Sequence, residues 1–285
     1  MEFLGGLAEA AERGRNGLLL IPLGDGGPGA HGAEETVGQA AVDGFCVHCV
    51  PDWHPALPAL TTRGLPVVVS DLRPEAGTAM GVGIEEAAAA REIARHLVAL
   101  GHRRIAVLGI GECPPAPVVV AGHWRDVRHW VGRERLRGYA EGLGERGVGW
   151  DDVTVVHVPG VSRESGAVAA ALVLDRVPRP TAIVAMADVL ALGVLDALDV
   201  RGLRPGADIS VAGFDDIPEA AAAGLTTVRQ PSRDKGRRAG ELLLDPPDDP
   251  SARRVVLPFA LVVRASTGPA PTGRETAYPA STRRS

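Results

Sequence analysis

Residues 208–231 read DISVAGFDDIPEAAAAGLTTVRQP, and this stretch indicates both the fold and a candidate site. Ile209–Phe214 is a short, continuous apolar run, which is typical of a strand buried on both faces of a parallel sheet. Asp215 and Asp216 follow directly at the carboxyl end of that strand. Because open α/β sheets bind ligands at the carboxyl ends of their strands, these carboxylates are candidates for ligand contact. The alternative is that an aspartate caps the loop before Pro218. This role would account for one of the two carboxylates but less well for both.

Similar apolar runs recur along the chain and alternate with amphipathic helical patterns. The strand candidates are Gly17–Pro22, Gly44–Val50, Pro66–Ser70, Arg104–Leu108, Val153–Val158, Thr181–Ala185 and Asp208–Gly213. The helix candidates are Phe3–Arg13, Glu85–Leu100, Glu134–Arg146, Ser162–Leu174, Val189–Arg201 and Asp234–Leu244. Repeated strand–helix–strand units imply right-handed crossovers and a doubly wound α/β architecture. There are too many units for one sheet, so the sequence predicts two similar lobes.

Composition limits the class of protein. The 285 residues carry 30 basic and 35 acidic side chains, a formal net charge of −5, without the basic excess typical of a DNA-binding surface. No apolar run approaches the length of about 18 residues that a membrane span needs. A signal peptide is not visible, and three cysteines (Cys46, Cys49, Cys113) are too few for a disulfide framework. We therefore expect a cytoplasmic protein.

Motifs for catalysis, cofactors and metals are weak. The match to G-x-G-x-x-G at 142–147 closes a helix instead of opening one, so it predicts no dinucleotide site. Cys46-x-x-Cys49, near His54, lacks a second cysteine pair and is interpreted as two packed thiols. The pair His123 and His129 is expected to be solvated. With no nucleophile elbow and no P-loop, the sequence predicts no enzyme, no cofactor and no metal site.

Further segments have recognisable patterns in a fixed order. They are Leu97–Ala106 (LVALGHRRIA), Glu134–Tyr139 (ERLRGY), Thr181–Gly193 (TAIVAMADVLALG), Lys235–Gly240 (KGRRAG) and Val262–Thr267 (VVRAST). Together with residues 208–231, they resemble the effector domain of the LacI/GalR family of bacterial transcription regulators, from about Phe3 to about Gly268.

The resemblance implies a periplasmic-binding-protein-like fold of type I, with two Rossmann-like, doubly wound lobes joined by three crossovers. We expect these crossovers near Leu108–Gly111, Val228–Pro231 and Pro258–Phe259. The N-terminal lobe would comprise 1–109 and 231–257, the C-terminal lobe 110–230 and 258–268, and residues 269–285 a disordered tail.

The resemblance also implies an effector site between the lobes. Arg135 and Asp215 match the family's two most regular effector contacts, and Asp71 would face them from the other lobe. Val161 stands where members often have an aromatic ring that stacks on the ligand. Ala187 stands where some sugar-binding members have a polar residue beside an aspartate, which is Asp188 here. We expect all three residues at the effector site. These two departures argue against a sugar stacked on a ring, and leave a sugar, a nucleoside or a related metabolite as the expected effector.

The start of the chain departs from the family. Members begin with a helix-turn-helix head, a hinge and a first strand, and none of these precedes Phe3 here. We therefore expect a homodimer that reaches operator DNA only through a head absent from this chain, and an N-terminal lobe weakened by the missing strand. The alternative function is the solute-binding protein of a sugar transporter, which would need a signal peptide.

Overall fold

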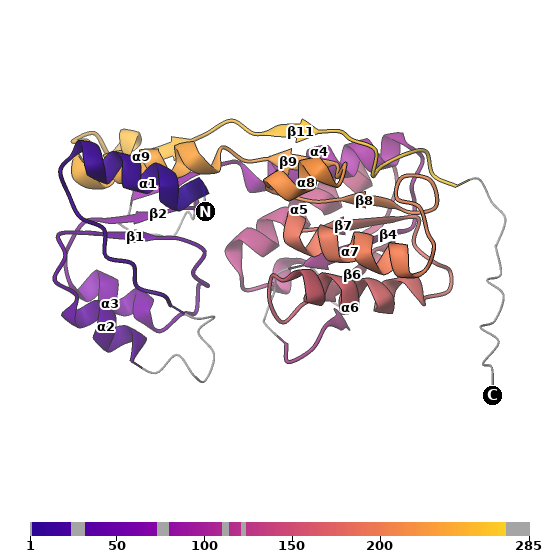
Figure 1. Ribbon diagram of the computed structural model, residues 1–285, viewed down its shortest axis with the longest axis horizontal. Helices are drawn as coiled ribbons and strands as arrows, with labels where there is room; N and C mark the ends of the chain where they lie inside the picture. Colours follow the sequence, from indigo (N-terminus) through magenta and orange to yellow (C-terminus); the bar gives the residue numbers. More distant parts are fainter. Residues whose placement is uncertain (1, 24–31, 73–79, 110–113, 121–123, 272–285) are drawn as a thin grey trace.

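A computed structural model of the chain describes residues 2–23, 32–72, 80–109, 114–120 and 124–271 (Figure 1). Within these residues, two sheets form the centres of two lobes. The N-terminal lobe has the order β1-β2-β3-β10, all parallel, from Phe45–Val47, Val67–Val69, Met80–Gly83 and Arg254–Val256. The C-terminal lobe has the order β5-β6-β4-β7-β8, from Val118–Val120, Thr154–His157, Ile105–Gly109, Ala182–Ala185 and Ser210–Ala212. Only β5 among these five strands runs antiparallel to its neighbour.

The helices cover both faces of the C-terminal sheet. In β4, Ile105 and Val107 face one apolar core and Ala106 and Leu108 face the other, as a strand buried on both sides requires. The first core is shared with α4 and α5, and the second with α6 and α7. The helices are α1 (Glu2–Arg13), α2 (Ala33–Gln39), α3 (Ala56–Thr62), α4 (Glu86–Ala99), α5 (Trp130–Gly144), α6 (Arg163–Leu174), α7 (Asp188–Val200), α8 (Pro218–Ala222) and α9 (Ser232–Leu244). The doubly wound, two-lobed α/β prediction is confirmed.

Within the described residues, the chain passes between the lobes three times. The first passage lies between β3 and α4, the second between β9 (Thr227–Arg229) and α9, and the third between β10 and β11 (Ala260–Val262). The last two are side by side, because β9 and β11 pair antiparallel (Figure 1).

The lobe boundary expected at residue 109 is wrong. Strand β4 is the centre of the C-terminal sheet, where Leu108 is in register with both Val156 and Ala185. Helix α4 belongs to the same lobe, because it packs so closely on α5 that a Cβ on Gly138 would overlap the carbonyl of Ala87. Residues 86–109 therefore move to the C-terminal lobe. The sequence could not show this, since it does not say which sheet a strand joins.

The strand predicted at Gly17–Pro22 is not formed. These residues are extended coil, and Leu18, Leu19 and Leu20 are 48, 60 and 71% exposed. The composition favours a strand, but a strand also needs a paired neighbour, and this segment does not pair with β1, which is at the edge of the described sheet.

Two other regions differ from, or extend beyond, the expectations. Residues 114–120 and 124–126, for which the sequence predicted no helix or strand, contribute the edge strand β5 and a short 3-10 helix at Trp124–Asp126. The tail predicted at 269–285 begins with residues that contact the C-terminal lobe, since the N–H of Ala270 donates to the carbonyl of Leu100 at 2.8 Å. The rest of this predicted tail, residues 272–285, lies outside the described part. None of the described helices is both long and apolar enough to cross a membrane.

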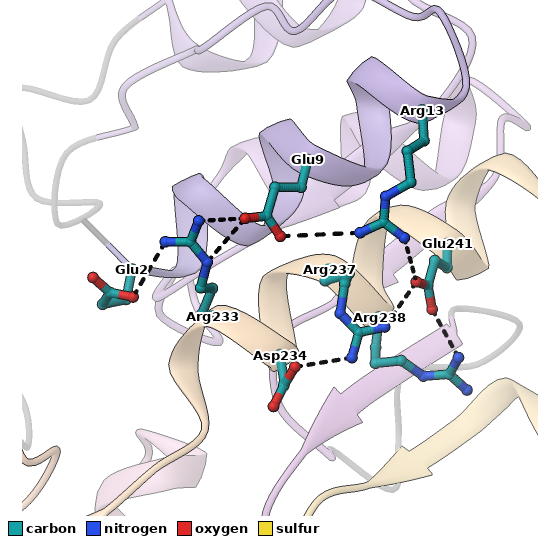
Figure 2. A network of polar contacts seen from close by, with 8 residues as sticks. All are labelled: Glu2, Glu9, Arg13, Arg233, Asp234, Arg237, Arg238 and Glu241. Carbon is teal, nitrogen blue, oxygen red and sulfur yellow. Dashed lines mark hydrogen bonds and ion pairs between the residues drawn. The ribbon is translucent and has the colours of Figure 1, made fainter.

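Helix α1 is held against α9 by direct backbone contact. A Cβ on Gly6 would overlap the carbonyl of Arg233, and a Cβ on Gly236 would overlap the carbonyl of Phe3. Ion pairs border this contact (Figure 2): Arg233 pairs with Glu2 and Glu9, and Arg13 reaches Glu241 at 3.6 Å. Because solvent screens ion pairs at the surface, these pairs add little to stability, and the glycine contact is the larger determinant.

We expect Gly236→Ala to lower the free energy of unfolding by about 1–3 kcal/mol, because the added methyl group forces α1 and α9 apart. Urea unfolding followed by circular dichroism measures this. Gly144→Ala is the matched control: Gly144 is also helical, has no atom within 4 Å of its would-be Cβ, and should be neutral or stabilised by up to about 1 kcal/mol. Equal stability of the two variants would contradict the close contact.

Candidate functional site

Arg135 lies in the second turn of α5 with its guanidinium buried in the C-terminal lobe. Its Nε donates to Oε2 of Glu86 at 2.8 Å, and its Nη1 donates to the carbonyl of Met186. The guanidinium carbon lies 3.6 Å from the centre of the Phe214 ring. Three elements, α4, the end of β7 and the end of β8, therefore fix its orientation. The two hydrogen bonds use two of its five N–H donors.

Asp215 and Asp216 have different roles. Both adopt positive φ (126° and 59°) in the tight turn after β8. Asp216 accepts from Arg229 and Arg264, each at 2.6 Å, so it closes the turn. Asp215 accepts at Oδ1 from Nε2 of Gln230 at 2.7 Å. Burial raises the pKa of Asp215 to about 7, although the positive charge of Arg135 acts in the opposite direction.

Asp188 supports this turn through its own hydrogen bonds, and its expected contact with an effector stays a prediction. It is fully buried, with Oδ1 accepting from the Thr227 hydroxyl at 2.6 Å and Oδ2 accepting from the Ile217 N–H at 3.0 Å. Its neighbour Ala187 caps the start of α7 and is 5% exposed. Val161 is 48% exposed in the turn before α6, and none of the polar contacts described for Arg135 or Asp215 involves it.

The N-terminal lobe contributes Asp71 and Cys49, which follow β2 and β1. Cys49 keeps one side exposed to solvent, but the surrounding protein desolvates its thiol and raises the pKa; the charges of Lys235, Asp215, Arg135 and Asp71 also act on it. This thiol therefore lies among charged side chains from both lobes. The charges of Asp71, Arg135 and Asp215 thus all reach the Cys49 thiol, and their contact with an effector stays a prediction.

Cys49 is exposed, so the interpretation of two packed thiols is wrong for it. Strand β1 ends at Val47, and Cys49 adopts a φ of 54° beyond that end. Its Sγ lies 3.4 Å from Nε2 of His48, whose ring stacks on Phe3 at 3.9 Å and whose Nδ1 is 2.6 Å from the Ser70 hydroxyl. Among the residues that the structure describes, no group of three or more His, Cys, Asp or Glu is placed to hold a metal ion.

Sequence reasoning missed the partners of the site. Glu86, Gln230 and Lys235 are polar residues that the helical and strand patterns assign to ordinary surface positions. Lys235 is nevertheless buried, with its Nζ 3.2 Å from Oε1 of Gln230. Gln230 thus connects Asp215 in one lobe with Lys235 in the other. Only the position of Gln230 at the end of the segment Leu225–Pro231 could have indicated this role.

Comparisons with known proteins identify the family of this chain. Residues 94–267 match the family model "Periplasmic binding protein-like domain". The chain is 39% identical over 274 residues to the HTH-type transcriptional regulator Rv3575c of Mycobacterium tuberculosis, covering 94% of this chain and 75% of that protein. A crystal structure of a LacI-family regulator from Corynebacterium glutamicum superposes with a TM-score of 0.83 at 31% identity, over 95% of this chain and 80% of that one. A complex of the regulator CelR with cellobiose gives 0.78 at 26% identity, over 93% and 78%.

We expect Glu86→Gln to lower the free energy of unfolding by about 3 kcal/mol or more, because it leaves the buried Arg135 guanidinium without its hydrogen-bonded counter-ion. Chemical denaturation measures the loss. Glu92→Gln on the same helix is the control: Glu92 pairs with Arg95 on the surface at 2.9 Å, so its substitution should leave the stability nearly unchanged. Similar losses in both variants would show that the Arg135 pair is not specially buried.

A pH series on Asp215→Asn tests the raised pKa of Asp215. A carboxyl group with a raised pKa stabilises the fold fully below its unfolded pKa, near 4, and this contribution disappears as the pH rises through about 7. The wild type should therefore lose stability relative to Asp215→Asn between about pH 4 and pH 8. Urea denaturation of both proteins measures the difference, and a pH-independent difference would contradict the raised pKa.

Proposed function

This chain belongs to the LacI family of HTH-type transcriptional regulators, and from that premise we propose that a neutral, polyhydroxylated small molecule binds between its lobes on Arg135 and Asp215. The chain contains the effector-sensing, periplasmic-binding-protein-like domain of such a regulator. Its relatives are named as HTH-type transcriptional regulators, which favours regulation over solute transport.

The Arg135–Asp215 arrangement is the observation that supports this effector class. A carboxylate accepts hydrogen bonds from hydroxyl groups, and a planar guanidinium donates two parallel bonds to neighbouring oxygens. The two side chains come from α5 and from the end of β8, and they are held in place by Glu86, Met186 and Gln230. Vicinal hydroxyl groups of a sugar, a cyclic polyol or a nucleoside ribose can donate to the carboxylate of Asp215 and accept from the guanidinium of Arg135.

The charge of the site supports a neutral effector. Glu86 already neutralises Arg135. The charges that act on the Cys49 thiol come from the carboxylates Asp71 and Asp215 and from the cations Lys235 and Arg135. A negatively charged effector would be repelled by the carboxylates of Asp71 and Asp215. Phe214, the aromatic ring beneath the site, is covered by the Arg135 guanidinium, and Val161 supplies no ring, so affinity must come mainly from hydrogen bonds.

In the proposed regulator, the effector changes the relative position of the lobes in a homodimer and so alters binding of a helix-turn-helix head to operator DNA. We place this function in the cytoplasm and assign no turnover to it. The cellobiose complex of CelR, a neighbour in structure, supports a sugar-like effector as one member of the proposed class.

A thermal-shift screen with pentoses, hexoses, cyclitols, disaccharides and nucleosides tests the effector class. A compound at a hundred times its dissociation constant should stabilise the wild type by about 2.7 kcal/mol. Asp215→Asn and Arg135→Lys should lose most of this shift. Asp215→Asn removes the anionic acceptor, and Arg135→Lys removes the planar guanidinium while keeping a positive charge beside Glu86. Asp175→Asn, at an exposed ion pair, is the control. Full responses in both site variants would refute the site.

A further inference from the structure

A contact between the lobes lies outside the Arg135–Asp215 pair. Asp52, in the segment that follows β1 in the N-terminal lobe, accepts at Oδ2 a hydrogen bond of 2.6 Å from the backbone N–H of Trp130. Trp130 is the first residue of α5 in the C-terminal lobe. A carboxylate is favourable at this position, because the first N–H groups of a helix lack partners within the helix and carry its positive dipole end.

The neighbouring residues make a second contact across the lobes. The ring of Trp53 meets the ring of His129 edge to face, with centres 6.1 Å apart and planes at 74°. The guanidinium carbon of Arg128 lies 5.3 Å from the centre of the same Trp53 ring. Edge-to-face and cation–π contacts of this kind add to the apolar burial of the tryptophan.

His129 is itself held in place. Its Nδ1 accepts from the Gly132 N–H at 3.1 Å, so it caps α5 from within the C-terminal lobe while Asp52 caps it from the other lobe. The two caps satisfy different N–H groups of the same first turn. The imidazole that meets Trp53 is therefore part of a rigid helix start.

We propose that Asp52 and Trp53, docked on Arg128, His129 and Trp130, form a latch that holds the two lobes together in the absence of effector. Helix α5 is fixed to its own lobe by the close contact of Gly138 with Ala87. The latch therefore acts on the position of one lobe relative to the other. It keeps the Cys49–Asp71 side of the site facing Arg135, which makes Asp52 and Trp53 positioning residues for the effector.

The consequence for affinity rests on the proposed function. If the effector needs both lobes, its apparent dissociation constant is the intrinsic one divided by the fraction of closed molecules. Weakening the latch then weakens binding without touching any group that contacts the effector. The latch itself can be tested with no effector present, so its failure is distinguishable from failure of the proposed site.

The experiment compares Asp52→Ala, Asp52→Asn and Trp53→Ala in the full chain by hydrogen–deuterium exchange and small-angle X-ray scattering. The informative amide is that of Trp130. Trp53→Ala retains the carboxylate of Asp52. Faster exchange at Trp130 in this variant therefore reports parting of the lobes and not removal of the capping side chain. Asp249→Ala is the matched control, since Asp249 caps the short helix at Pro250–Arg253 within one lobe.

We expect exchange at Trp130 to accelerate about fivefold or more in Asp52→Ala, and also in Trp53→Ala, together with a larger radius of gyration in both. Asp52→Asn should stay near the wild type, because asparagine caps helices as well as aspartate does. The control should match the wild type in both measurements. Unchanged scattering in Asp52→Ala and Trp53→Ala, with exchange at Trp130 unchanged in Trp53→Ala, would overturn the latch.

Discussion

The buried ion pair between Arg135 and Glu86 is the interaction on which the candidate site depends. Desolvating a guanidinium costs several kcal/mol unless a well-placed anion and further hydrogen bonds compensate for it. Here Glu86, the carbonyl of Met186 and the Phe214 ring provide that compensation from three different elements. The pair therefore ties α4, α5 and two strand ends together, and it holds Arg135 in one orientation before any ligand arrives.

That arrangement is possible only because α4 and α5 are unusually close. Side chains at Gly138 and Gly142 would overlap the backbone of α4 at Ala87 and Arg91, so these helices meet backbone to backbone. The same device joins α6 to α7 at Gly166 and Gly193, and α1 to α9 at Gly6 and Gly236. Close helix pairs leave little freedom within a lobe. Motion is left to the three passages between the lobes and to contacts such as that of Asp52 with Trp130.

The sequence predicted the features that depend on a short-range pattern of residues. Continuous apolar runs located most of the described strands, and the carboxyl end of Ser210–Ala212 located Asp215. It could not assign β4 to a lobe, and it could not foresee that Gly17–Pro22 has no partner strand, because both depend on which segments pair in space. It also placed Asp188 at the effector site without showing that Asp188 is buried and accepts two hydrogen bonds from the protein, which give it a supporting role in the turn after β8.

Gln230 shows why the site and the passage between the lobes cannot be separated. It donates to Asp215 in the C-terminal lobe and accepts from Lys235 on α9 in the N-terminal lobe, across the second passage of the chain. Lys235 is 7% exposed, and a buried ammonium group left without an acceptor is costly. A change in hydrogen bonding at Asp215 therefore alters the environment of a buried charge in the other lobe. That charge is on the helix whose backbone is in contact with α1.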